Sequence, residues 1–254
     1  MVEKDGLVFK RDFNADEREA RTQMPRLLNE SPIPEVERPD NLGLYMDHIQ
    51  VGKILFLDHL YQQIVNIPGV IMEFGCRWGQ NLATFSNLRA IYEPTNHLRR
   101  IYGFDTFAGF VDAAPEDLNR DYAVPGMLAT TENYEEHLEK VLRANELSKA
   151  ISHKQKYLIF KGDIRDTLPT FLNQRKQTII SLAYLDMDLY GPTKAALEAI
   201  APHLVRGSVV VLDELNDEAF PGETLAVQEV LGLRNLALKR VPYLTQPSYF
   251  IFDG

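Results

Sequence analysis

The sequence predicts an α/β protein built on an open, doubly wound and mostly parallel sheet. Three observations support this prediction: short apolar runs recur along the chain, amphipathic helical segments separate them, and turns with polar residues or glycine follow several of them. Short apolar strands that alternate with helices are typical of a sheet covered by helices on both faces. Such sheets bind ligands beyond the carboxyl ends of their strands. We therefore expect the chemistry of the protein at those ends.

The N-terminal residues 1–43 differ from the rest and are expected to form an arm or lid. The first 40 residues are rich in charge and contain four prolines. A short helix is expected at 15–29, although Pro25 interrupts its pattern, and 30–40 is expected to be an extended linker. A disordered terminus is the alternative. The segment lacks the apolar stretch of a secretory signal peptide, so we expect a cytoplasmic protein.

Residues 44–254 are expected to form one ligand-binding domain. Helices are expected at 44–65, 80–91, 131–149, 165–175 and 192–204, and strands at 70–74, 100–104, 157–160, 179–185 and 208–212. Apolar positions at helical spacing support the helices, and Thr131 is the expected N-cap of the third. Two further runs, at 236–241 and 248–252, flank a turn that contains proline and predict a C-terminal hairpin.

Composition excludes several classes of function. The chain has 254 residues, of which 45 % are hydrophobic and 25 % charged, as in an ordinary globular protein. Its net charge of −9, from 27 basic and 36 acidic residues, argues against nucleic acid as a partner, because phosphate binding needs a basic surface. A single cysteine allows no intramolecular disulfide, as expected in a reducing compartment. No apolar run approaches the ~18 residues of a membrane span, so no membrane partner is expected.

The first two strands end in residues that suit a nucleoside ligand with a positive charge. Gly75 and Gly79 lie in the turn after strand 70–74, where backbone N–H groups can approach and bind an anionic group. Asp105 ends the next strand, at a distance along the chain where an acid can accept hydrogen bonds from a ribose diol. Glu73 lies inside the first strand and suits an amine or a sulfonium, which favours S-adenosylmethionine over NAD. An ordinary strand–helix turn is the alternative.

The third strand is followed by Asp163 and Ile164. An aspartate and an apolar residue at this place can bind an adenine amino group and cover the face of the ring. The alternative is an aspartate that only caps the helix expected at 165–175.

Four carboxylates follow the fourth and fifth strands, namely Asp186, Asp188, Asp213 and Glu214. The ends of these strands are neighbours in a doubly wound sheet, and like charges so close together need a counter-charge. A hard divalent cation with oxygen ligands supplies it. The two segments contain no His or Cys, which argues against zinc. Beyond the strand end Asp186 and Asp188 can diverge, so that one binds the metal and the other faces the substrate. Acids that only cap the following helices are the alternative.

Together these residues resemble the class I S-adenosylmethionine-dependent methyltransferases. The resemblance is strongest to the macrocin O-methyltransferase-like sugar O-methyltransferases of natural-product pathways, including nucleotide-deoxysugar enzymes of antibiotic biosynthesis. The matching motifs are E-F-G-C-R-W-G at 73–79, D-T-F-A-G at 105–109, G-D at 162–163, D-T-L-P at 166–169, L-D-M-D-L-Y at 185–190 and L-D-E at 212–214. The resemblance implies a seven-stranded Rossmann-like sheet with an antiparallel C-terminal hairpin, a short N-terminal arm and a homo-oligomer.

The resemblance also implies a role for each site residue. Asp186, Asp213 and Glu214 would hold Mg²⁺ or a similar cation, and Asp188 would be the general base that takes the proton from a sugar hydroxyl. His48 is chosen for its position and not by the resemblance: it precedes the first strand, on a segment expected to border the pocket, and is a second candidate base. S-adenosylmethionine would be bound by Glu73, Gly75, Arg77, Gly79, Asp105, Thr106, Asp163, Ile164 and Asp186.

Two residues depart from the family pattern. Glu214 stands where the family has a second aspartate, which lengthens one metal ligand by a methylene group and affects the position of the ion. Arg77 and Trp78 invert the Trp-Arg order of the family, which puts the family role of the arginine in doubt.

Three other functions are weighed against sugar O-methylation. A Mg²⁺-dependent catechol-type O-methyltransferase would use a similar set of carboxylates. An NAD-dependent oxidoreductase would need a G-x-G-x-x-G turn, which the spacing of Gly75 and Gly79 does not fit. A non-catalytic binding protein on the same sheet would be expected to have a gap in the acidic set, and none is found.

Overall fold

The computed structural model describes residues 14–117 and 123–254. The first thirteen residues of the predicted arm, and residues 118–122 of the loop after the second strand, lie outside the described residues. The chain divides into two compact units, Met1–Ile54 and Leu55–Gly254. Among the described residues, every helix is too short or too polar to span a lipid bilayer.

The N-terminal unit begins with the predicted helix. Helix α1 spans Ala15–Asn29 and includes Pro25. It starts with a capping box, in which the Glu17 N–H donates to Asn14 Oδ1 at 2.9 Å and the Asn14 N–H donates to the Glu17 carboxylate at 2.8 Å. The capping box satisfies two backbone donors that a helix start leaves unpaired.

The prediction of an extended linker at 30–40 is wrong for the second half of that segment. Short 3-10 helices form at Glu35–Glu37 (η2) and Pro39–Tyr45 (η3). Proline fixes φ near a value that suits a helical turn and is tolerated at its start, and Pro34 and Pro39 stand at the starts of these two turns. The prolines that indicated an extended segment therefore begin 3-10 turns.

Helix α2 spans His48–Ile64, a shorter range than the expected 44–65 because η3 continues to Tyr45. Asp47 caps it, since its Oδ1 accepts hydrogen bonds from the N–H groups of Ile49 at 2.9 Å and Gln50 at 3.0 Å. The helix begins in the N-terminal unit and continues into the second unit.

The second unit contains the predicted sheet, which has seven strands among the described residues. They are β1 (Val70–Phe74), β2 (Ile101–Asp105), β3 (Tyr157–Lys161), β4 (Ile180–Leu185), β5 (Leu204–Leu212), β6 (Lys239–Arg240) and β7 (Ser248–Ile251). Their order in the sheet is β3-β2-β1-β4-β5-β7-β6. Strands β1 to β5 run parallel to one another, while β7 is antiparallel to β5 and to β6. The doubly wound sheet and its C-terminal hairpin are thus confirmed.

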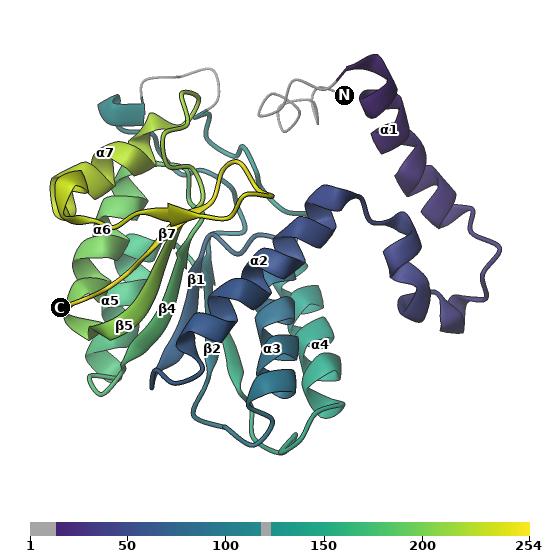
Figure 1. Ribbon diagram of the computed structural model, residues 1–254, viewed down its shortest axis with the longest axis horizontal. Coiled ribbons are helices and arrows are strands. Elements are labelled where there is room, and N and C mark those ends of the chain that lie inside the picture. Colours follow the sequence, from purple (N-terminus) through teal and green to yellow (C-terminus); the bar gives the residue numbers. More distant parts are fainter. Residues whose placement is uncertain (1–13, 118–122) are drawn as a thin grey trace. The chain divides into compact units, whose positions relative to one another are not determined.

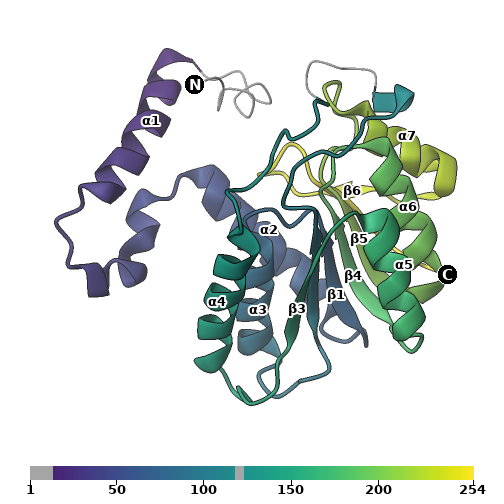
Figure 2. The same cartoon turned by 180° about the vertical axis from the view of Figure 1, so that it is seen from behind.

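Helices cover both faces of this sheet (Figures 1 and 2). One face carries α2, α3 (Gln80–Tyr92) and α4 (Tyr134–Leu147), and the other carries α5 (Ile164–Gln174), α6 (Tyr190–Ile200) and α7 (Pro221–Val230). Three further 3-10 turns lie at Pro115–Asp117 (η4), Ala201–His203 (η5) and Leu233–Asn235 (η6). The strand order changes direction between β1 and β4, and ligands bind at such a switch point in folds of this kind.

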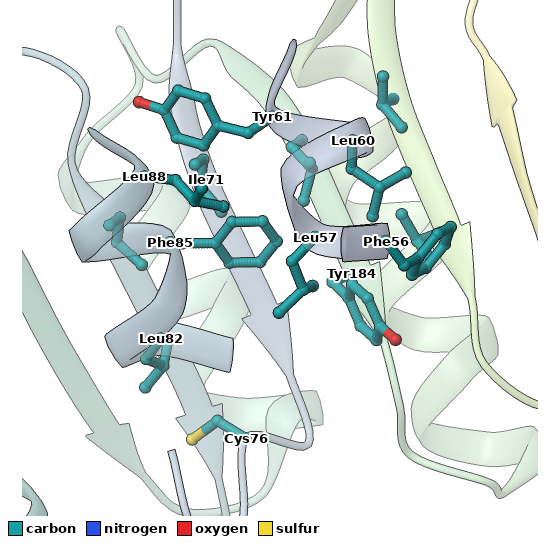
Figure 3. Packing of buried hydrophobic residues seen from close by; sticks show 14 of the residues in the cluster. Phe56, Leu57, Leu60, Tyr61, Ile71, Cys76, Leu82, Phe85, Leu88 and Tyr184 are labelled. Atoms are coloured by element: carbon teal, nitrogen blue, oxygen red, sulfur yellow. The ribbon is translucent and has the colours of Figure 1, made fainter. Parts of the chain in front are cut away.

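An apolar cluster fills the space between the sheet and the first helical layer. Figure 3 shows Phe56 and Leu57 of α2, Phe85 of α3, Ile71 of β1 and Tyr184 of β4 in this cluster. All five side chains are fully buried. Burial of each such side chain contributes roughly 1.5–3 kcal/mol, and it fixes α2 and α3 against the strands whose ends form the site.

Two expectations about helices are corrected. Helix α4 begins at Tyr134, and its N-cap is Asn133 in a left-handed conformation with a φ of 55°, so Thr131 does not cap it. Helix α7 follows Phe220, where the sequence pattern predicted no element. Its sequence begins with Pro221 and Gly222, which mark turns more often than helices, although proline is common in a first helical turn.

Candidate active site

The turn after β1 brings backbone of two strands into contact. Gly75 has a φ of 85°, and a Cβ atom placed on it would lie 1.8 Å from the carbonyl oxygen of Asp186. The Asp186 N–H in turn donates to the carbonyl of Phe74 at 2.8 Å. The position therefore requires glycine for both conformation and space. At the other end of the turn Gly79 has a φ of 74°, and a Cβ there would meet the Leu138 side chain.

Asp105 ties the turn after β1 to the turn after β2. Its Oδ2 accepts the Arg77 N–H at 2.7 Å, and its Oδ1 accepts the Phe107 N–H at 2.6 Å. Burial raises the pKa of Asp105, and these two backbone donors and the Arg77 charge offset part of that effect. Each carboxylate oxygen has a second lone pair, so the group keeps acceptors for a ribose diol. That role stays a prediction.

Thr106 shapes the same turn after β2. Its hydroxyl donates to the Gly109 carbonyl at 2.8 Å and accepts the Ala108 N–H at 3.2 Å. These bonds are local and give Thr106 a structural role, while its predicted contact with the cofactor is not tested by them.

Two buried polar residues, Glu73 of β1 and Asn81 of α3, flank the turn after β1. Glu73 is only 2 % exposed, and strand alternation puts it on the same side of β1 as Ile71, the side that α2 and α3 cover. Asn81, in the first turn of α3, is 3 % exposed, and no donor among the described residues reaches its Oδ1. A buried acid and an unsatisfied buried acceptor fit a ligand that carries an ammonium or sulfonium group. Nothing in the sequence singles out Asn81, because a single asparagine in a helix carries no signal.

Asp163 is the N-cap of α5, which is the alternative that we weighed for it. Its side chain accepts the Arg165 N–H at 2.8 Å and pairs with the Arg165 guanidinium. Arg165 also pairs with Asp112 at 2.9 Å, and its hydrogen bonds lower the pKa of Asp163. Ile164 is buried in the apolar cluster between the sheet and α5, α6 and α7. The adenine contacts predicted for Asp163 and Ile164 stay predictions.

Three carboxylates gather at the ends of β4 and β5. Oxygen atoms of Asp186, Asp188 and Glu214 lie within 4.8 Å of one another. Asp188 is 4 % exposed and Glu214 is 2 % exposed, while Asp186 is half-buried. Asp188 has a φ of 61°, so the chain leaves the strand direction and returns its side chain toward Asp186. An all-carboxylate set of this size fits a hard cation such as Mg²⁺.

Asp213 lies outside this three-carboxylate group. Its Oδ1 accepts the hydroxyl proton of Tyr184 at 2.6 Å. Strand alternation accounts for the contact with Tyr184: Val209 and Val211 of β5 point toward the first helical layer, as Tyr184 does, and Asp213 continues that side. Asp188, which we expected to act as the base, stands in the group in its place. Whether Asp213 binds a metal stays a prediction.

Arg77 places a positive charge near this group. Burial lowers the pKa of its guanidinium, and the charges of Asp186, Asp188 and Asp105 act in the opposite direction. Its guanidinium also lies 5.6 Å from the centre of the Trp78 ring. The inverted Arg-Trp order thus leaves a cation beside the acidic group.

Glu223 is a fully buried carboxyl group of the site that sequence analysis missed, because it lies on the unexpected helix α7. Its Oε1 accepts the Glu214 N–H at 2.8 Å. Burial raises its pKa, and the charges of Asp213, Glu214 and Asp188 add to this shift.

His48 is the first residue of α2 and lies in the N-terminal unit. Its role as a second base stays a prediction. The same holds for the lid role of the arm.

Comparison with known proteins identifies the family. The sequence model of the macrocin O-methyltransferase family matches residues 40–237. A crystal structure of CalS11, described as calicheamicin methyltransferase, is 44 % identical over 95 % of both chains, with a TM-score of 0.93. An apo structure of CalS11, described as a TDP-rhamnose 3′-O-methyltransferase of calicheamicin biosynthesis, is 42 % identical over 95 % of this chain and 96 % of that one, with a TM-score of 0.84.

A more distant structure, the O-methyltransferase NovP, is 20 % identical over 80 % of both chains with a TM-score of 0.62, and shares the fold. No curated protein matches the sequence. The family match covers most of the chain, and it agrees with the sheet order and with the carboxylates at the strand ends. The chain belongs to the macrocin O-methyltransferase family and is an S-adenosylmethionine-dependent O-methyltransferase.

Proposed function

We propose that this enzyme methylates a hydroxyl group of a deoxysugar, either on a nucleoside diphosphate or on a glycosylated natural product, with the help of a divalent cation. The observation that carries the proposal is the group of Asp186, Asp188 and Glu214 at the switch-point edge of the sheet. The likeness to CalS11 over 95 % of the chain supports a sugar as the acceptor. Mg²⁺ is the cation that we expect.

The residues of the site suggest how the reaction is assisted. When bound, S-adenosylmethionine supplies the methyl group and the cation lowers the pKa of the acceptor hydroxyl. Asp188 takes the hydroxyl proton at its carboxylate, as a general base. Asp186 and Glu214 would hold the cation. The Glu73 carboxylate would attract the positively charged sulfonium or ammonium group of the cofactor. The near-complete burial of Asp188 and Glu214 keeps water from competing.

A panel of acceptors tests the proposal. We expect turnover with TDP-rhamnose or a related nucleotide sugar in the presence of S-adenosylmethionine and Mg²⁺, and little turnover with catechol. Removal of metal with EDTA should abolish activity, and Mg²⁺ in excess over the chelator should restore it. Turnover with catechol alone would favour the catechol-type alternative, and full activity in metal-free enzyme would contradict the role of the cation.

A further inference from the structure

Glu214 lies in the turn that follows β5, and two residues of α7 hold the backbone of this turn. The Glu214 N–H donates to Glu223 Oε1 at 2.8 Å, and the Asn216 N–H donates to Thr224 Oγ1 at 2.8 Å. The second residue of α7 is Gly222, where a Cβ would lie 2.0 Å from Asp117 Oδ1 and 2.5 Å from the Tyr190 nitrogen, so the start of this helix packs closely against η4 and the start of α6. These bonds place the Cα atom of Glu214, but they do not orient its carboxylate.

The carboxylate of Glu214 is held instead from the other side, by Gln246. The Gln246 side-chain amide donates to Glu214 Oε2 at 3.2 Å and to Asp217 Oδ2 at 2.9 Å. Asp217 is itself fixed, because its Oδ1 accepts the Ala219 N–H at 2.7 Å. An amide nitrogen carries two protons, so one group can bridge the two anions.

The register of the sheet explains why Gln246 reaches Glu214. Strand β7 is antiparallel to β5, and Leu212 pairs with Ser248. In an antiparallel pair, two residues further along one strand face two residues back on the other. Beyond the pair of Leu212 and Ser248, the next pair on the same face of the sheet is therefore Glu214 and Gln246. These two residues lie just past the strand ends.

We propose that Gln246 is a positioning residue that orients the Glu214 carboxylate for the divalent cation. The inference rests on the proposed cation site. Glutamate has one more rotatable bond than the aspartate of the family pattern, and a hydrogen bond to one oxygen removes part of that freedom. The amide also lies between two anions, Glu214 and Asp217, whose repulsion would otherwise act on the ligand. Groups that orient a metal ligand in this way typically change metal affinity by about 10–100-fold.

The test uses Gln246→Met, which keeps the side-chain volume and removes the donor. Mn²⁺ binding is measured by electron paramagnetic resonance on the full-length protein, together with the Mg²⁺ dependence of turnover. We expect about tenfold weaker Mn²⁺ binding and a similar rise in the Mg²⁺ concentration for half-maximal rate, with kcat at saturating Mg²⁺ near that of the wild type. The matched control is Gln228→Met, at an exposed position of α7, which should change neither value.

A second pair of variants separates orientation of Glu214 from general support of the fold. Glu214→Asp shortens the ligand, so the amide no longer reaches it, and Gln246→Met added to Glu214→Asp should weaken Mn²⁺ binding no further. An equal loss in both backgrounds, or unchanged Mn²⁺ binding in Gln246→Met, would overturn the inference. If Gln246→Met does not fold, Gln246→Ala provides the same comparison. A wild-type protein that binds no Mn²⁺ would contradict the cation site and the inference together.

Discussion

Asp188 combines three properties that suit a catalytic base: it is nearly buried, it has a left-handed backbone conformation, and two further carboxylates lie beside it. Such a conformation costs of order 1–3 kcal/mol for a residue with a Cβ and is concentrated at functional sites. Aspartate and asparagine tolerate it better than most residues. The replacement Asp188→Asn therefore tests the charge without a change in backbone preference.

We expect Asp188→Asn to lower kcat by roughly 10²–10⁴-fold, the usual contribution of a general base. Affinity for S-adenosylhomocysteine, measured by calorimetry, should stay close to that of the wild type, because Asp188 is assigned to the acceptor and not to the cofactor. A variant with normal turnover would remove Asp188 from the mechanism.

Gly75 is the position where the geometry of the turn is least tolerant of a side chain. In Gly75→Ala the new methyl group would overlap the Asp186 carbonyl, so the end of β4 must move. The matched control is Gly126→Ala, where φ is 80° and no atom lies within 4 Å of the added carbon. We expect Gly126→Ala to cost about 1 kcal/mol in the free energy of unfolding, and Gly75→Ala to cost clearly more and to weaken cofactor binding. Equal losses in urea denaturation would contradict the close approach of the two strands.

At the scale of single residues, the sequence indicated which residues belong to the site better than it indicated their hydrogen-bond partners. Asp105, Asp186 and Asp188 were found because each ends or follows an apolar strand, and Glu73 because it is an acid inside one; both patterns are local. Contacts that depend on register were not accessible: the bond from Tyr184 to Asp213 and the bond from Gln246 to Glu214 follow from how β5 pairs with β4 and β7.

At the scale of elements, hydrophobic periodicity located the five parallel strands to within a few residues. The predictions failed where another signal competed with periodicity. Prolines in 30–45 begin 3-10 turns, and the Pro221-Gly222 pair begins α7. The missed helix matters for function, because Glu223 and Thr224 hold the turn that presents Glu214.

A buried group of charges connects α3, α4 and the start of β3. The fully buried Glu146 carboxylate pairs with Arg89 at 3.3 Å and with Lys156. Lys149 lies beside them and donates to Ser86 Oγ at 2.7 Å. Burial and the charges of Arg89 and Lys156 lower the pKa of Lys149 to about 8. The protein therefore holds this lysine in a site that disfavours its charged form.

The lowered pKa predicts how stability depends on pH. The pKa of Lys149 is about 8 in the folded chain, and an ordinary lysine has a pKa of about 10.4. Between these two pH values the unfolded chain therefore binds more protons at Lys149 than the folded chain does. The contribution of Lys149 to the free energy of unfolding must therefore rise with pH across this window. We expect wild type to gain stability relative to Lys149→Met between pH 7.5 and 9.5 in urea denaturation. Lys140→Met, at an exposed position of α4, should show no such gain, and a flat difference for Lys149→Met would contradict the shift.

At the scale of the whole chain, the strand order decides which residues meet. The change of direction between β1 and β4 brings the ends of β1, β2, β4 and β5 to one edge of the sheet, so that residues more than one hundred positions apart share a site. The alternation of strands and helices along the sequence predicts this convergence. The lid role of the arm and the homo-oligomer depend on contacts beyond the sheet, and both stay predictions.

With a net charge of −9, the protein is stabilised by any salt, because ions screen the repulsion between its acidic residues. Mg²⁺ can therefore raise its stability without binding at the site. Specific binding adds RT ln(1 + [L]/Kd), or about 1.4 kcal/mol at ten times Kd, and this term needs an intact site. We expect Mg²⁺ to raise the melting temperature of metal-free wild type more than KCl does at equal ionic strength.

Asp186→Asn removes one of the three carboxylates while leaving the other acidic residues in place. It should therefore respond to Mg²⁺ only as it does to KCl, because screening acts on the whole charge and specific binding acts on the site. S-adenosylhomocysteine, added alone, should stabilise the wild type and test the cofactor site independently of the metal. An equal response of wild type and variant to Mg²⁺ would mean that the acidic surface, and not the group at the strand ends, takes up the cation.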